Sequence, residues 1–147
     1  MTKVTFQGWF DDIIGNMKLR MRGNSIRLRL TRSEAAQFAE TGSVTETIEF
    51  GVMEPELSYQ LLAARDGAMM SAQFIDNNLR VWIPKNDAEN WINSDQVGIE
   101  ASQELGKDKI LRILVEKDFA CLSERTGEDE SDAFPNPFIS ETLELGC

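Results

Sequence analysis

Hydrophobic and charged residues alternate along residues 17–30, which read MKLRMRGNSIRLRL. Alternation with a period of two is typical of β-strands that carry one apolar and one polar face. The pair Gly23-Asn24 interrupts this pattern, and glycine adopts a positive φ at little cost. The sequence therefore predicts two strands joined by a two-residue hairpin turn.

The two-residue turn also determines which side chains face each other across the hairpin. Leu19 lies opposite Leu28 on the apolar face, and Arg20 lies opposite Arg27 on the other face. A three-residue turn would instead place apolar residues opposite cations. The hairpin is thus expected to gather on one face the cations Lys18, Arg20, Arg22, Arg27 and Arg29.

The remaining pattern predicts two short helices and several further strands. Thr31 and Glu34 have the spacing of a capping box, and Gly42 ends the helix that they begin. Asn86 and Glu89 have the same spacing and predict a second helix over residues 86–94. Strands are expected over residues 43–51, 56–63, 71–75, 78–84, 96–102 and 109–122, with the Asp76-Asn77 turn joining the two in the middle.

About eight strands and two short helices indicate a mainly β fold of the α+β class. Most connections are too short for parallel crossovers, so we expect an antiparallel barrel or a strongly curved sheet. A chain of 147 residues with 41% hydrophobic residues can bury one core. We expect an N-terminal extension or alternative start over residues 1–16 and a single compact domain over residues 17–147, with no internal repeat evident.

The cationic face is unusual because the chain has a formal net charge of −10. Like charges directly opposite each other on paired strands are destabilising by up to about 1 kcal/mol per pair. Carboxylates of the same chain, an anionic ligand or screening by solvent could each relieve this repulsion. A candidate lid is the acidic loop in the C-terminal region, which carries Glu128, Asp129, Glu130 and Asp132.

Composition excludes several kinds of chemistry and several partners. The chain has no histidine, which removes Ser-His and Cys-His nucleophiles and histidine-ligated zinc. It has neither a Gly-rich phosphate loop nor a cysteine pair at metal spacing, and Cys121 and Cys147 suggest no disulfide framework. No signal peptide or membrane span is apparent, so we expect a cytoplasmic protein. Residues 33–147 hold 23 acidic and 8 basic side chains, a field that makes nucleic acid an unlikely partner.

Three stretches resemble the signature segments of an uncharacterised family of small bacterial proteins, known only as a domain of unknown function. They are MKLRMRGNSIRLRLTRSE from Met17, SDQVGIE from Ser94, and LVEKDFACLSERTGEDESDAFPNP, which ends at Pro137. The resemblance covers nearly all of residues 17–137. It implies a start at Met17 for such proteins and brings no activity, cofactor or catalytic residue.

The cationic face is also similar in kind to that of triphosphate tunnel enzymes, in which arginines hold phosphates and glutamates hold a divalent metal. Arg112, on a later strand, joins the hairpin arginines in this comparison. The likeness implies that Mg²⁺ or Mn²⁺ would be held by Glu49, Glu100 and Glu116. The chain departs from those enzymes because its first strand reads MKLRMR and lacks their E-x-E-x-K string.

These observations favour a small binding or regulatory module over an enzyme, with no cofactor. Its cationic β-face, formed by the hairpin cations and Arg112, would receive an anion from its own acidic loop, from a small phosphate- or carboxylate-bearing ligand, or from an acidic protein segment. Two alternatives stay open. One is a divalent-metal-dependent phosphohydrolase, and the other is a structural subunit of an assembly.

Overall fold

The computed structural model describes residues 17–119 and positions 132, 134, 135 and 137. Two α-helices lie in this part of the chain, α2 (Arg32–Thr41) and α3 (Lys85–Ile92). The strands are β1 (Lys18–Arg22), β2 (Ser25–Leu30), β3 (Ser43–Ile48), β4 (Leu57–Ala64), β5 (Ser71–Ile75), β6 (Asn78–Pro84), β7 (Gly98–Gly106) and β8 (Lys109–Lys117). The predicted mainly β fold with two helices is confirmed.

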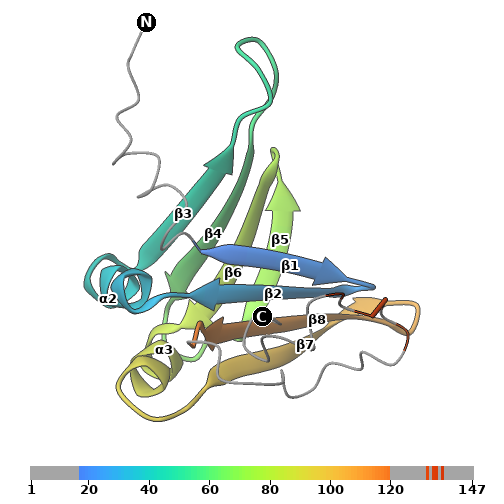
Figure 1. The fold of residues 1–147 in the computed structure, drawn as a ribbon. Helices are drawn as coiled ribbons and strands as arrows, with labels where there is room; N and C mark the ends of the chain where they lie inside the picture. The colour runs from blue at the N-terminus through green and yellow to red at the C-terminus, as the bar shows by residue number, and fades with distance from the viewer. Residues whose placement is uncertain (1–16, 120–131, 133, 136, 138–147) are drawn as a thin grey trace, which may run out of the picture.

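The eight strands form two four-stranded sheets (Figure 1). Sheet A has the order β1-β2-β8-β7, and sheet B has the order β3-β4-β6-β5. No closed barrel is found within the described residues. The expectation of antiparallel pairing throughout is wrong at the centre of each sheet, where β2 pairs with β8 and β4 pairs with β6 in parallel. At least one other strand lies between the two partners of each pair in the sequence, so no short hairpin connection constrained their direction.

The topology contains an internal duplication that the sequence does not make apparent. A β-hairpin, a helix and two further strands form one unit, and this unit occurs twice: β1-β2-α2-β3-β4 and β5-β6-α3-β7-β8. Each unit contributes strands to both sheets, so sheet A corresponds to sheet B by an approximate two-fold relation. The corresponding segments 18–38 and 71–91 are identical at only three positions, Asn24/Asn77, Arg27/Arg80 and Ala35/Ala88.

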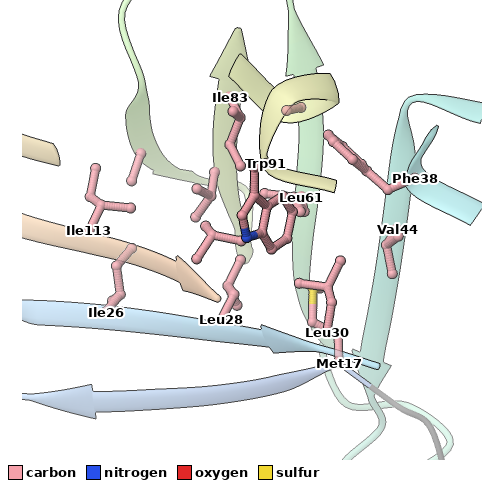
Figure 2. Close-up of a cluster of buried hydrophobic side chains, with 14 residues drawn as sticks. Met17, Ile26, Leu28, Leu30, Phe38, Val44, Leu61, Ile83, Trp91 and Ile113 are labelled. Atoms are coloured by element: carbon pink, nitrogen blue, oxygen red, sulfur yellow. The ribbon is translucent and has the colours of Figure 1, made fainter. Parts of the chain in front are cut away.

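The hydrophobic core lies between the inner faces of the two sheets and is closed at one end by the helices (Figures 1 and 2). Leu28 of β2 and Val115 of β8 pair on one side, and Leu61 of β4 and Val81 of β6 pair on the other. Trp91 of α3 is fully buried between them, and its indole Nε1 donates a hydrogen bond to the Val97 carbonyl (3.1 Å). The β1-β2 and β5-β6 turns lie at the ends of the two sheets away from the helices (Figure 1).

The β1-β2 hairpin has the predicted register. Leu19 pairs with Leu28 and Arg20 pairs with Arg27. Gly23 has φ +56°, the positive value that the two-residue turn requires. The Asp76-Asn77 turn between β5 and β6 is confirmed as well, since both of its residues have positive φ.

The first predicted helix is confirmed at both ends, whereas the second begins earlier than expected. In α2, Glu34 accepts hydrogen bonds from the Thr31 backbone N–H (2.8 Å) and hydroxyl (2.9 Å), and Gly42 ends the helix in the left-handed region. Helix α3 begins at Lys85, directly after Pro84. Asp66, in the loop that follows β4, accepts the Asn86 N–H at 3.2 Å. A tertiary carboxylate thus replaces the local cap that the sequence predicted at Asn86.

Strand β3 is shorter than its alternation predicted and ends at Ile48. Only Val44 is buried in it, while Ile48 and Phe50 are 45% and 65% exposed. The segment beyond Ile48 extends past the sheet as a long loop (Figure 1). An apolar alternation at the end of a strand therefore did not imply burial.

A tyrosine of β4 connects the start of β1 to sheet B. The Tyr59 hydroxyl donates a hydrogen bond of 2.7 Å to the carbonyl of Met17, whose side chain is buried. Burial raises the pKa of Tyr59, and the nearby carboxylates of Glu46 and Glu34 raise it further. The tyrosine is thus held in the neutral state in which it can donate this bond.

Candidate functional site

The outer face of sheet A carries charged side chains in three rows across its four strands. The first row, nearest the helices, is Lys18, Arg29, Glu116 and Gly98 in the order β1-β2-β8-β7. The middle row is Arg20, Arg27, Leu114 and Glu100, and the third row is Arg22, Ser25, Arg112 and Ser102. The alternation of each strand placed these residues outside because its other residues fill the core.

The middle and third rows line a hollow of about 720 Å³, which we call the arginine hollow. Its lining includes four of the six predicted cations, Arg20, Arg22, Arg27 and Arg112. Arg112 comes from β8, far along the chain from the hairpin, so the structure does bring it beside the hairpin arginines. A volume of this size is in the range of small-molecule sites.

Carboxylates of the same chain neutralise the first row. Glu116 lies 2.5 Å from Arg29 Nε and 3.6 Å from Arg27 Nε, and its side chain is only 15% exposed. Lys18 pairs with Asp118 at 2.8 Å, directly after β8. Glu116 and Asp118 therefore relieve part of the like-charge repulsion expected on this face. Asp118 was not recognised from the sequence.

The third row has no carboxylate and holds two exposed arginines, Arg22 and Arg112. Neither guanidinium has a hydrogen bond or an ion pair with any residue that the structure describes. They stand two strands apart, which corresponds to roughly 10 Å between their Cα atoms. Two side chains of this length can converge on one anion of phosphate size.

Hydrogen bonds of the hairpin turn connect the strands that carry these two arginines. The Arg112 N–H donates to the Asn24 carbonyl (3.1 Å), and Asn24 Nδ2 donates to the Ile110 carbonyl (2.8 Å). Ser25 Oγ donates to the Arg22 carbonyl (2.6 Å). The turn that the sequence predicted is thus attached to β8 as well as to its own hairpin.

The middle row combines arginine with a carboxylate. Arg20 and Arg27 both make further noncovalent contacts, so they are not an open pair of cations. Glu100 lies at the β7 end of the row and is exposed in the arginine hollow. Ser102, its neighbour on the same face, and Ser25 also line the hollow. Both serines lie on the polar face of their strands, and the alternation of polar and apolar residues in the sequence could have identified them.

The three carboxylates considered for a divalent metal do not form one cluster. Glu100 and Glu116 lie in different rows of sheet A, and Glu49 follows β3 in sheet B. Within the residues that the structure describes, no group of three potential metal-binding side chains occurs.

Most of the acidic loop, namely Glu128, Asp129 and Glu130, lies outside the described residues, and Asp132 is exposed in a turn. Cys121 and Cys147 also lie outside the described residues.

The corresponding face of sheet B provides an internal comparison. Its rows are Ser71-Trp82-Leu62-Ser43, Gln73-Arg80-Gln60-Thr45 and Ile75-Asn78-Ser58-Thr47. Arg80 is the one charged residue among these twelve positions, whereas the equivalent twelve of sheet A hold six cations and two carboxylates. Arg80 donates to Gln60 (3.2 Å), and Gln60 donates to Thr45 (3.1 Å). The cationic character is therefore specific to sheet A and is not required by the fold.

Neither helix in the described part of the chain has the length and apolar character needed to span a lipid bilayer.

Comparison with known families identifies the domain. Residues 17–138 match the sequence model of DUF7009, a family of unknown function, and the chain belongs to this family. The predicted resemblance to an uncharacterised domain beginning near Met17 is thereby confirmed. No curated protein and no solved structure matches the chain.

Proposed function

We propose that this member of DUF7009 is a binding module whose arginine hollow receives a compact anion bearing phosphate or carboxylate groups. The observation that carries the proposal is the contrast between two equivalent sheet faces. Twelve matched positions hold a net charge of +4 on sheet A and +1 on sheet B. Structural needs common to both halves do not account for cations on one face alone.

Arg22 and Arg112 are the residues proposed to bind the anion directly. Arginine presents two parallel N–H donors that match the oxygens of phosphate and carboxylate, and such bonds are about twice as strong as neutral ones. Ser25 lies between the two arginines and Ser102 lies beside Arg112 in the same row. Ser102 can add a hydroxyl donor, whereas the Ser25 hydroxyl already donates to the Arg22 carbonyl. Arg29 and Lys18 contribute less, because Glu116 and Asp118 already pair with them.

Glu100 would limit which anions bind. A carboxylate in the same hollow repels a purely anionic ligand, but it can accept a hydrogen bond from a ligand hydroxyl or amine. A ligand that joins an anionic group to such a donor would satisfy both sides of the hollow. A phosphorylated sugar and an amino-acid carboxylate are examples of this chemistry.

The charge of the rest of the chain favours a compact ligand over a polymer. The net charge of −10 repels an extended polyanion at long range, whereas a single small anion needs to enter only the hollow.

The acidic loop could compete with an external anion for the same cations. Replacing Glu128, Asp129, Glu130 and Asp132 with serine should then raise the affinity for an external anion. If the loop covers the site, the apparent affinity is the intrinsic affinity multiplied by the fraction of molecules in which the site is uncovered.

Calorimetry with inorganic triphosphate tests the proposal on the full-length protein. Arg22→Gln and Arg112→Gln should each weaken binding by about ten-fold or more, since a hydrogen bond to a charged group contributes about 1.5 to 3 kcal/mol. Arg80→Gln is the matched control, because it removes one arginine from the equivalent face of sheet B and should leave binding unchanged.

Glu100→Gln should strengthen triphosphate binding by about two-fold or more, because it removes one like charge from the hollow. The absence of binding to triphosphate, citrate and sugar phosphates alike would refute the proposal. Release of phosphate from triphosphate that depends on Mg²⁺ or Mn²⁺ would instead support the phosphohydrolase alternative.

A further inference from the structure

The end of the molecule opposite the helices carries an apolar hollow that the anion site does not use. It has a volume of about 380 Å³ and lies between the two sheets, close to the hairpin turns. Its lining is apolar apart from Gln73 and includes Leu19, Met21, Leu57, Phe74, Leu79 and Leu111. We call it the tip groove.

The internal duplication places the tip groove between corresponding residues of the two halves. Met21 and Phe74 occupy equivalent positions of β1 and β5, and they are 68% and 62% exposed. Leu57 and Leu111 are equivalent positions of β4 and β8 and also line it. The helices close one end of the shared core (Figure 1), whereas Met21 and Phe74 at this end stay open to solvent.

The loop between β3 and β4 extends beyond sheet B (Figure 1) and carries further exposed apolar side chains. Phe50, Val52 and Met53 of this loop are 65%, 101% and 92% exposed. A shallow depression beside the loop is lined by Phe50, Glu54, Glu56 and Leu57, and Leu57 also lines the tip groove. The two hollows are therefore neighbours in one elongated surface. Exposed apolar patches of this kind mark interaction sites.

Charge indicates what kind of partner this surface fits. Residues 49–56 contain three glutamates and no basic residue, and two of the glutamates line the depression next to the tip groove. A second copy of the chain would bring two such acidic rims together, and an anionic lipid surface would be repelled. A helix with an apolar stripe and basic flanks complements both the groove and its rim.

We propose that the tip groove and the β3-β4 loop bind a basic amphipathic helix of a partner protein. The apolar stripe of the helix occupies the groove between Met21 and Phe74. Its basic residues lie against Glu54 and Glu56. Ile26 lines both hollows, but the arginines lie on the outer face of sheet A and Met21 on its other face. Arg22→Gln and Met21→Ser therefore test the two proposals separately.

The test uses the full-length protein and a fluorescein-labelled amphipathic peptide of about 18 leucines and lysines, with leucines at helical spacing. Fluorescence anisotropy should show binding that a scrambled peptide of the same composition lacks. Met21→Ser and Phe74→Ser preserve the net charge and should each weaken binding by about ten-fold or more. Met69→Ser is the matched control, because Met69 is 82% exposed in the loop before β5 and does not line the groove.

Glu54→Gln combined with Glu56→Gln should weaken binding about three-fold or more and reduce its dependence on salt. Equal binding by the Met21, Phe74 and Met69 variants would overturn the proposal, as would equal binding of a peptide in which glutamate replaces lysine. If sedimentation velocity shows a dimer and Phe74→Ser dissociates it, the occupant of the tip groove would be a second copy of the chain. If the peptide binds only after Trp9→Ser and Phe10→Ser, the occupant of the tip groove would be residues 1–16 of the same chain and not a partner helix.

Discussion

Replacing Glu116 with glutamine is the most direct test of how the cationic face is stabilised. Glu116 is the carboxylate that lies between Arg27 and Arg29, and glutamine preserves its size while removing its charge. The side chains of Arg27, Arg29 and Glu116 are 24%, 22% and 15% exposed, so water screens the lost interaction only in part. Two guanidinium groups, with Lys18 opposite Arg29, would then lie on one face without their common counter-charge.

The expected cost is about 2 to 3 kcal/mol in the free energy of unfolding. A fully buried ion pair that loses one partner costs about 3 to 5 kcal/mol, and an exposed pair contributes at most about 1 kcal/mol. The exposure of Glu116 places it between these limits and nearer the buried one. With a urea m-value of about 1 to 3 kcal/mol per molar, the unfolding midpoint should fall by about 0.7 to 3 M.

Urea unfolding followed by tryptophan fluorescence measures this change. Glu104→Gln is the matched control, because it makes the same charge change at an exposed position of β7 and should shift stability by less than about 0.5 kcal/mol. Added salt should narrow the difference between Glu116→Gln and the unchanged protein, since salt screens the remaining repulsion. A Glu116 variant as stable as the Glu104 variant would show that the ion pairs contribute little and would refute the reasoning.

Three further predictions concern other parts of the fold. Tyr59 is the one tyrosine of the chain, so absorbance at 295 nm should report its ionisation alone, with a pKa above 10.0 that Glu46→Gln lowers. The pKa of Tyr59 is higher in the folded than in the unfolded protein, so its contribution to stability is complete below pH 10.0 and is lost as the pH rises through the folded pKa. Urea unfolding at alkaline pH would detect this loss. Gly98→Ala should cost about 1 to 3 kcal/mol in thermal or urea melts, because its Cβ would lie 2.7 Å from the Val115 carbonyl oxygen. Deleting residues 1–16 should leave one cooperative transition at an unchanged temperature, and aggregation would show that Trp9 and Phe10 are needed for folding.

The sequence alone determined those parts of the fold that depend on neighbouring residues. A strict alternation around Gly23-Asn24 was enough to predict the register that pairs Leu19 with Leu28 and Arg20 with Arg27. The capping box of α2 was predictable for the same reason, since Thr31 and Glu34 are three residues apart. In each case the interacting groups lie within one turn or one hairpin, where local geometry leaves few alternatives.

The environment of the candidate site was decided only by the tertiary structure. Alternation predicted that Arg112 and Glu116 share a face of their strand, but not that this strand would lie parallel to β2. That pairing places Glu116 beside Arg29 and so makes it a counter-ion of the arginines. It places Arg112 in the third row, where no carboxylate lies.

The duplication shows the physical reason for this division. Each half needs apolar residues on the inner phase of its strands, a turn between them and a helix to close the core, and many sequences meet these needs. Both halves therefore have the alternation, as in Leu28 and Val81, while their outer residues differ, with Arg20 equivalent to Gln73 and Arg29 equivalent to Trp82. The observed sheet order buries both apolar faces around Trp91. This order, which depends on strands distant in the sequence, determines which outer charges meet.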